Sequence, residues 1–415
     1  MGADVKILII GTADTKADEL QFLKRCVEGA GARAAVMDVG VLGQPSFVPE
    51  YPRTRVADAA GATLAAIAAL GDENQAMQKM AEGAVKLALS LYRAAEVHGI
   101  LALGGTMGTD LALDVTAAMP LGMPKLIVST VAYSHLLPAE RLAPDLMMIL
   151  WAGGLYGLNS VCQSILSQAA GALVGACRAV LAPQGKRPLV AISSLGKSCL
   201  SYMADLNPAL EERGFEPVVF HTTGMGGRAM ESLLKQGAFV AVFDFSLQEL
   251  ANFKAGSVVT AGAQRLEAAG QRAIPQLVAP GAGDMVDLQA WAPLPARYQG
   301  RPYHAHNRLL GSTVSSAEER RELARLIAAK LNRAKGPTAL LLPCGGIQAW
   351  DRPGEALHDP AGQTAFMDEF RRSIKPPVEL LDLDLHINDP AFVAAALAIF
   401  DRWVAEGLIP SPARP

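Results

Sequence analysis

The chain has 415 residues and a mass of 43.6 kDa, a length that suggests two or three domains. Hydrophobic residues make up 51% and charged residues 19%, so the chain is too apolar to be disordered. The net charge of −3 gives no sign of a nucleic-acid or membrane-surface partner. Because the five cysteines are scattered and no signal-peptide pattern precedes the first apolar run, we expect a reduced, cytoplasmic protein.

Short apolar runs alternate with helical patterns through residues 1–182. Strands are predicted at Lys6–Ile10, Ala34–Val39, Ile100–Leu103 and Lys125–Val128, and helices over Ala17–Glu28 and along a stripe from Met77 to Leu91. In the uncharged stretch Leu146–Cys177, the purely apolar part is far shorter than the ~20 residues of a membrane span. We therefore interpret it as a buried strand, a Gly-rich turn and a buried helix.

The segment 183–188 contains two prolines, a glycine and two charges, and is predicted to be a linker. The alternation then restarts over 189–415, with strands at Leu189–Ile192, Pro217–Phe220, Phe239–Phe243, Gln276–Ala279, Thr338–Leu342 and Val378–Leu381, and a closing helix at Pro390–Glu406. Strands that alternate with helices predict parallel sheets. The expected fold is α/β, with two consecutive Rossmann-like, doubly wound domains, 1–182 and 189–415.

Ligands of such sheets bind at the carboxyl ends of the strands, so the loops there are the candidate sites. The first loop contains Gly11, Thr12, Asp14, Thr15 and Lys16 at the start of a helix. Free N–H groups there favour an anion, Lys16 is placed to touch a phosphate, and Asp14 to hold Mg²⁺ through water. The alternative is ordinary helix capping by Asp14 or Thr15.

Three further stretches of the first domain are candidates for the same crevice. The second loop contains Gly104, Gly105, Thr106, Gly108 and Thr109; its glycines let a ligand approach the backbone, but it lacks the dinucleotide-binding spacing. Ser129 and Thr130 follow the next strand and would complete the crevice. Asn159 is either a helix cap or a ligand contact.

The second domain carries the chemically reactive side chains. We predict Arg228 as a clamp for a carboxylate or phosphate, with His221, Asp244, Asp284, His304 and His306 as polar or acid–base groups. The two histidines of His304-Ala-His306 share a side of an extended segment, which leaves metal binding open beside polar lining of a pocket. Ala191–Ser198 is close to a Walker A loop, but Ala191 replaces its first glycine. Cys344 is either a nucleophile or a small buried residue.

Taken together, these strings resemble an uncharacterised family of bacterial and fungal proteins that shares its domain with the plant tomato mosaic virus resistance protein. The resemblance is carried by the strings at 11–19, 103–109, 122–132, 157–160, 220–231, 280–286, 304–307 and 386–389. It implies an ATP-binding first domain with Mg²⁺, two Rossmann-like halves and a homodimer. The implied nucleotide contacts are the loops at 11–16 and 104–109, Ser129, Thr130 and Asn159. Departures at 194–198, 243–249 and 310–313 lie in the second half and put a shared substrate in doubt.

The leading hypothesis is a cytoplasmic protein that binds ATP and Mg²⁺ and acts as an enzyme on a small anionic metabolite in its C-terminal half. One alternative is a non-enzymatic nucleotide-binding regulatory module. The other is a metal-dependent lyase or hydrolase in which ATP has a structural part only.

Overall fold

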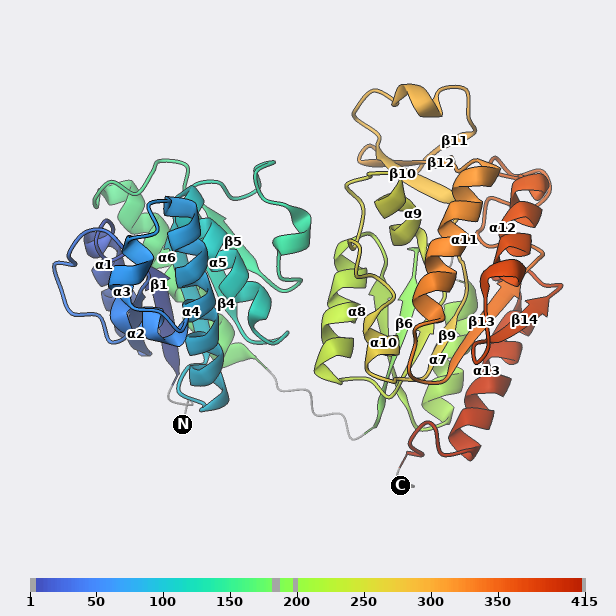
Figure 1. Cartoon of the computed structure of the whole chain (residues 1–415), viewed down its shortest axis with the longest axis horizontal. Coiled ribbons are helices and arrows are strands. Elements are labelled where there is room, and N and C mark those ends of the chain that lie inside the picture. Colours follow the sequence, from blue (N-terminus) through green and yellow to red (C-terminus); the bar gives the residue numbers. More distant parts are fainter. Residues whose placement is uncertain (1–4, 181–186, 197–200, 413–415) are drawn as a thin grey trace. The chain divides into compact units, whose positions relative to one another are not determined.

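A computed structural model describes residues 5–180, 187–196 and 201–412. The chain divides into two compact units, Met1–Pro183 and Gln184–Pro415, each with its own parallel sheet (Figure 1). Lys197 and Ser198 of the Walker-like string, Cys199 and most of the predicted linker lie outside the described residues.

The first unit is built on a five-stranded parallel sheet in the order β2-β1-β3-β4-β5. Its elements are β1 (Lys6–Gly11), α1 (Ala17–Gly29), β2 (Arg33–Asp38), α2 (Arg53–Ala59), α3 (Leu64–Ala68), α4 (Glu73–Arg93), β3 (Gly99–Gly104), α5 (Thr106–Ala118), β4 (Lys125–Ser129), η1 (Ala139–Arg141), β5 (Met147–Leu150) and α6 (Ser160–Ala179). Leu8 and Ile10 of β1 pack under α2, α4 and α5, while Ile7 and Ile9 pack under α1 and α6. Burial on both faces explains why the strands read as continuous apolar runs.

The second unit has a six-stranded parallel sheet in the order β14-β13-β9-β8-β6-β7 and a small antiparallel sheet in the order β10-β12-β11. Its elements are β6 (Leu189–Ser194), α7 (Ser201–Glu212), β7 (Glu216–His221), α8 (Met225–Gln236), β8 (Ala241–Asp244), α9 (Gln248–Lys254), α10 (Ala268–Gln271), β9 (Gln276–Val278), β10 (Met285–Gln289), η3 (Ala296–Tyr298), β11 (Tyr303–Ala305), β12 (Leu310–Val314), α11 (Ala317–Leu331), β13 (Thr338–Pro343), α12 (Pro360–Ser373), β14 (Glu379–Leu383) and α13 (Pro390–Ala405). The helices α7 and α13 cover one face of the large sheet, and α8 to α12 cover the other.

These sheets confirm the predicted fold class, two Rossmann-like α/β units. The short helices α2 and α3 and the antiparallel sheet were not predicted. The antiparallel sheet escapes pattern analysis because β11 is three residues long and half-exposed, too short to show alternation.

The helix α6 is long and apolar enough to cross a membrane by length and composition alone. One of its faces, with Cys162, Leu166 and Leu173, packs into the core of the first unit beside α1. The helix α6 therefore covers one face of the sheet, as expected for the helix predicted in the stretch Leu146–Cys177.

Both parallel sheets change winding direction at one point. In the first unit, β1 lies between β2 and β3; in the second, β6 lies between β7 and β8. The loops after β1 and β3 in the first unit, and after β6 and β8 in the second, therefore run to opposite faces of the sheet and open a crevice at its carboxyl edge. Each unit accordingly has one position where a ligand site is expected.

Candidate functional site

A cavity of about 680 Å³ lies at the switch point of the first unit. Its walls come from the loops after β1, β2 and β3 and from the start of α4. The lining residues are Thr12, Asp14, Thr15, Lys16, Gly40, Val41, Leu42, Ala68, Gly71, Asp72, Glu73, Ala76, Met77, Gly104, Gly105, Thr106, Met107 and Gly108. The loops at 11–16 and 104–109, predicted from the sequence as candidate sites, thus face a common cavity.

The turn from β3 into α5 exposes main-chain amides to this cavity. No side chain caps α5, whose N-cap residue is Gly105, and the first N–H groups of a helix have no partner within the helix. Gly104 is required for the turn, because a Cβ at this position would lie 2.6 Å from the backbone of Gly108. With the helix dipole, the free amides favour a negatively charged ligand group.

Two carboxylates lie at the same edge of the sheet. Asp14 accepts hydrogen bonds from the N–H groups of Leu42 and Gly43 at 3.2 and 3.1 Å through Oδ2, and its buried Oδ1 has no hydrogen-bond partner among the residues that the structure describes. Asp38 accepts from the N–H groups of Ala13 and Gly40, both at 2.9 Å, through Oδ1, and its buried Oδ2 is without a partner in the same described part of the chain. Burial raises the pKa of Asp38, and the negative charge of Asp14 acts in the same direction.

Lys16 lines the cavity and also makes contacts within the protein. Its ammonium donates to the carbonyl oxygen of Leu155 and lies 5.2 Å from the centre of the Tyr156 ring. These contacts hold the Lys16 ammonium at one side of the cavity.

The other predicted nucleotide contacts of this unit, Thr109, Ser129, Thr130 and Asn159, are outside the cavity lining. The Thr109 and Ser129 hydroxyls, both fully buried, are 2.7 Å apart and so join the start of α5 to the end of β4. Thr130 donates its backbone N–H to Gly104 at 3.3 Å. The Asn159 side chain accepts from the N–H groups of Val161 and Cys162 at 3.1 and 2.9 Å, so it caps α6, which was one of the two predicted roles.

A second cavity, of about 310 Å³, lies at the switch point of the second unit. It is lined by loops after β6, β7 and β8, by β10 and β12, and by Trp350. The lining residues are Leu195, Gly196, His221, Thr223, Gln248, Met285, Asp287, His306, Leu310, Ser312 and Trp350. Of the six predicted chemical residues, the structure brings His221 and His306 together here.

The floor of this cavity is polar and buried. Asp287, 1% exposed, accepts from the Ser312 hydroxyl at 2.6 Å and from the Asn252 amide at 3.3 Å. Burial raises the pKa of Asp287, while hydrogen bonds from Ser312 and Asn252 and the nearby His306 oppose the rise. The Oε1 and Nε2 atoms of Gln248 are buried and have no hydrogen-bond partner within the described ranges.

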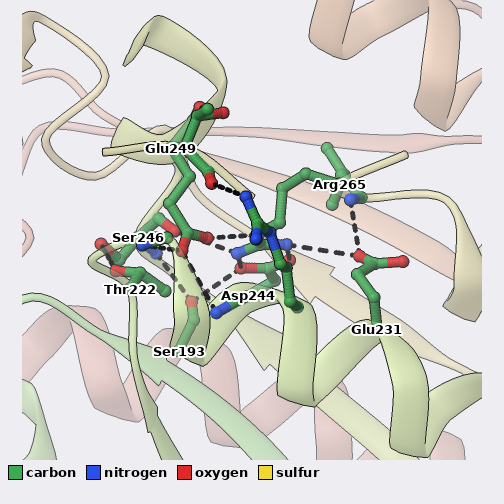
Figure 2. A network of polar contacts seen from close by, with 12 residues as sticks. Ser193, Thr222, Glu231, Asp244, Ser246, Glu249 and Arg265 are labelled. Atoms are coloured by element: carbon green, nitrogen blue, oxygen red, sulfur yellow. Dashed lines mark hydrogen bonds and ion pairs between the residues drawn. The ribbon is translucent and has the colours of Figure 1, made fainter. Parts of the chain in front are cut away.

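Asp244 lies instead in a buried ionic network (Figure 2). The Arg265 guanidinium, fully buried, donates to Asp244 Oδ2 and Oδ1 at 2.5 and 2.6 Å and to Glu249 Oε2 at 2.7 Å, and lies 3.6 Å from Glu231. Ser193 donates to Asp244 at 2.7 Å. Burial raises the pKa values of Glu231 and Glu249, although Arg265 opposes the rise. Each member has partners within the protein, which is typical of a structural network.

The Gly-rich loop after β7, predicted as an anion site, is filled by the protein itself. Glu249 Oε1 accepts from the N–H groups of Gly224 and Gly227 at the start of α8, at 2.7 and 3.1 Å. Arg228 donates to the carbonyl oxygen of Thr260 at 2.8 Å and does not line the second cavity. His304 packs on Trp350, with ring centroids 4.4 Å apart, and is outside the cavity lining as well.

Asp284 lies at a third, small cavity of about 140 Å³. Burial raises its pKa to about 6; the Arg320 charge opposes the rise and the Asp351 charge adds to it. Its Oδ2 accepts from the Gln348 amide at 3.2 Å, and its buried Oδ1 has no hydrogen-bond partner in the described part of the chain. Cys344 borders this cavity too, and burial raises the pKa of its thiol, which does not favour a nucleophile.

Sequence reasoning missed Asp38, Gln248, Asp287 and Trp350. A signal existed for Asp287, because it is two residues after Met285 on one strand and so shares its face. Asp38 is the last residue of a buried strand beside the Asp14 loop. No local pattern distinguishes Gln248 or Trp350, whose places depend on tertiary packing.

The fold and the two cavities define a two-domain α/β protein with a candidate small-molecule site in each domain. The chain belongs to the uncharacterised protein family UPF0261: the N-terminal domain of that family matches residues 5–182 and its C-terminal domain matches residues 187–404.

Relatives of known sequence span nearly the whole chain. A UPF0261 protein of Brucella melitensis is 55% identical over 97% of this chain and 97% of its own length. One of Clostridium tetani is 35% identical over 94% of this chain and 96% of its own. A ToMV resistance protein of Solanum lycopersicum is 29% identical over 95% of this chain but only 55% of its own length. The family likeness predicted from the sequence motifs is thus confirmed at the level of the family.

Proposed function

We propose that the first unit binds ATP together with Mg²⁺. The observation that carries the proposal is the cavity shared by the two predicted loops, Gly11–Lys16 and the Gly-rich Gly104–Thr109, at the switch point of a doubly wound sheet. Nucleotides bind at this position in folds of this class. Its volume of about 680 Å³ suits a ligand of that size.

The cavity divides into regions that match the parts of ATP. Phosphates would take the open amides of the β3–α5 turn, with Lys16 nearby. The base would pack among Val41, Leu42 and Met77. Mg²⁺ prefers carboxylate oxygens, water and phosphate, and the unpartnered Oδ1 of Asp14 fits it; Gly40 lets that carboxylate approach, since a Cβ there would lie 2.7 Å from Asp14 Oδ1.

We further propose that the second unit is the enzymatic part and acts on a small anionic metabolite. His221 and His306 in one cavity, with the buried carboxylate of Asp287, are the groups that support proton transfer. The proposal keeps a cytoplasmic homodimer as the expected form of the protein. It leaves out Arg228 and Asp244, whose contacts lie within the protein.

The rival is a non-enzymatic nucleotide-binding module, which the likeness to a resistance protein favours. The metal-dependent alternative stays a prediction, which metal analysis of the purified chain tests. The cavity of the second unit distinguishes an enzyme from a regulatory module, because a regulatory module has no need of two imidazoles in one cavity.

Calorimetric titration of the full chain with ATP tests the main proposal, with and without Mg²⁺ and with AMP and NAD as comparison ligands. We expect ATP to bind, Mg²⁺ to tighten the binding, and Asp14→Asn to remove the Mg²⁺ effect while the chain stays folded. Asp18→Asn is the matched control, because Asp18 is an exposed carboxylate on α1 outside the cavity lining. Binding of NAD but not ATP would overturn the proposal.

A further inference from the structure

We propose that the cavity of the second unit binds a short polyhydroxylated carboxylate, that is, a sugar acid. The inference rests on the proposed function, since it names the ligand class of the same cavity. It is carried by three features of that cavity: a buried amide side chain whose hydrogen-bonding atoms lack partners within the described ranges, two imidazoles, and an aromatic wall.

The buried Gln248 side chain calls for a hydroxyl group. Gln248 is 1% exposed, and both atoms of its amide group, the acceptor Oε1 and the donor Nε2, lack a partner within the described ranges, which is costly for buried groups. Beside it, Asp287 is an equally buried carboxylate that already accepts from Ser312 and Asn252. A hydroxyl group both donates and accepts, so a ligand with hydroxyl groups can satisfy both atoms of the Gln248 amide.

The two imidazoles would bind the carboxylate of the ligand. His221 and His306 are the side chains able to carry positive charge among the described lining residues, because no lysine or arginine is among them. The His221 ring reaches Gly196, where a Cβ would lie 3.6 Å from its Cε1. An imidazole N–H group can donate a hydrogen bond to a carboxylate, and a histidine can also act as an acid or base.

A phosphate is a poorer fit than a carboxylate here. The amides of Gly224 and Gly227, which would have gripped a phosphate at the start of α8, already hold Glu249. Arg228, the predicted clamp, bonds to Thr260. The cavity, at about 310 Å³, is also at the small end of the ~300–1,000 Å³ typical of ligand sites.

Trp350 supplies the apolar wall. Its ring is fixed by His304, at 4.4 Å between centroids with planes 30° apart, and its backbone N–H donates to the Gln348 side chain at 2.7 Å. An aromatic ring held in this way packs against the C–H face of a sugar chain while the hydroxyl groups point to Gln248 and Asp287. Met285 and Leu195 complete the apolar part of the wall.

The test is ligand-detected NMR and calorimetry on the full chain with three sugar acids: D-glycerate, D-threonate and D-gluconate. Sorbitol is the control that lacks the carboxylate, and hexanoate is the control that lacks the hydroxyl groups. We expect at least one sugar acid to bind tenfold or more tightly than either control. Binding no tighter than that of sorbitol or hexanoate would overturn the proposal.

Variants separate the site from the fold. Gln248→Leu and His306→Gln should each weaken sugar-acid binding at least tenfold. The Gln248→Leu chain should keep its unfolding midpoint, because the substitution removes a buried amide group whose two polar atoms lack partners among the described residues. His98→Gln, in the first unit, is the matched imidazole control and should bind normally. Unchanged binding in both cavity variants would overturn the assignment of the site.

Succinate and inorganic phosphate distinguish this inference from the proposed function. If either binds in a His306-dependent way and no sugar acid does, the anionic substrate stands and the sugar-acid class is wrong. If none of these anions binds while ATP still does, the enzymatic role of the second unit fails as well, and the nucleotide site of the first unit is unaffected.

Discussion

The turns β3–α5 and β7–α8 look alike in sequence and differ in what occupies them. Both are Gly-rich strand-to-helix connections at the carboxyl edge of a parallel sheet, and both start a helix without a side-chain cap from the N-cap residue. In the first unit the turn borders a cavity of about 680 Å³. In the second, Glu249 reaches over from α9 and takes two of the amides at 2.7 and 3.1 Å.

The difference shows that a Gly-rich turn exposes backbone amides to an anion, but that an anionic side chain of the protein itself can occupy them. A carboxylate from the protein itself satisfies the same amides and dipole that a phosphate would. Glu249 is held in place by Arg265 at 2.7 Å, so the filled turn is part of the buried network of the second unit. The corresponding turn of the first unit lines the cavity, and under the proposal above it would take its anion from solution.

Breaking the buried network should give the largest effect. Arg265→Met leaves Asp244 and Glu249 buried without their cation, and loss of one partner from a buried pair costs about 3–5 kcal/mol. We expect the second unit to unfold at much lower denaturant while the unfolding of the first unit is unchanged. Urea denaturation followed by circular dichroism, with ATP added to mark the first unit, measures both transitions.

Lys125→Met is the matched change in the first unit. The Lys125 amine is fully buried and lies 2.7 Å from Asp145, but that carboxylate is 26% exposed and can be hydrated when its partner is lost. A smaller loss of stability is therefore expected than for Arg265→Met. Equal losses in the two variants would contradict the view that burial of all partners makes the Arg265 network critical.

Gly104 and Gly105, adjacent in the β3–α5 turn, provide a matched pair of substitutions that tests this turn as the phosphate site. Gly104→Ala places a Cβ 2.6 Å from the Gly108 backbone, and overpacking of this kind costs about 1–3 kcal/mol. In Gly105→Ala the nearest atom is Thr130 Oγ1 at 3.9 Å, which is ordinary contact. Calorimetry should find ATP binding lost in the first variant and retained in the second. Normal ATP binding by Gly104→Ala would argue against this turn as the phosphate site.

The sequence predicted the strands and the loops that follow them, because apolar runs of a buried parallel sheet and the glycines that end them are local signals. It therefore located the cavity of the first unit from Gly11–Lys16 and Gly104–Thr109. Partners far apart in sequence were beyond its reach: nothing local says that Asp244 pairs with Arg265 or that Glu249 caps α8. For the same reason the sequence predicts one pocket for the six chemical residues of the second half, whereas the structure places only His221 and His306 of these six in the lining of the second cavity.

Asp284 offers a smaller, pH-dependent contrast within the second unit. Its pKa is about 6 in the folded chain, against about 3.9 for an unfolded aspartate, so the folded state binds more protons between these values. Ionisation of Asp284 therefore lowers the free energy of unfolding as the pH rises from about 4 to about 6, and this loss is reversed as the pH falls again. Asp284→Asn should stabilise the chain most at pH 7.5, and the advantage should shrink by about 1 kcal/mol at pH 5. Denaturation curves of both proteins at the two pH values measure this; an advantage independent of pH would mean that Asp284 is ionised in the folded chain throughout.

The smallest expected effect separates capping from ligand binding at Asn159. Because its side chain accepts from Val161 and Cys162, Asn159→Ala should cost about 1 kcal/mol in the first unit, and Asn159→Ser, which restores a cap, much less. Neither variant should change the affinity for ATP once both are folded, since Asn159 is outside the cavity lining. A loss of ATP affinity in Asn159→Ser without a loss of stability would instead place this side chain on the ligand. The site of the first unit would then extend beyond the loops of β1, β2 and β3 to the start of α6.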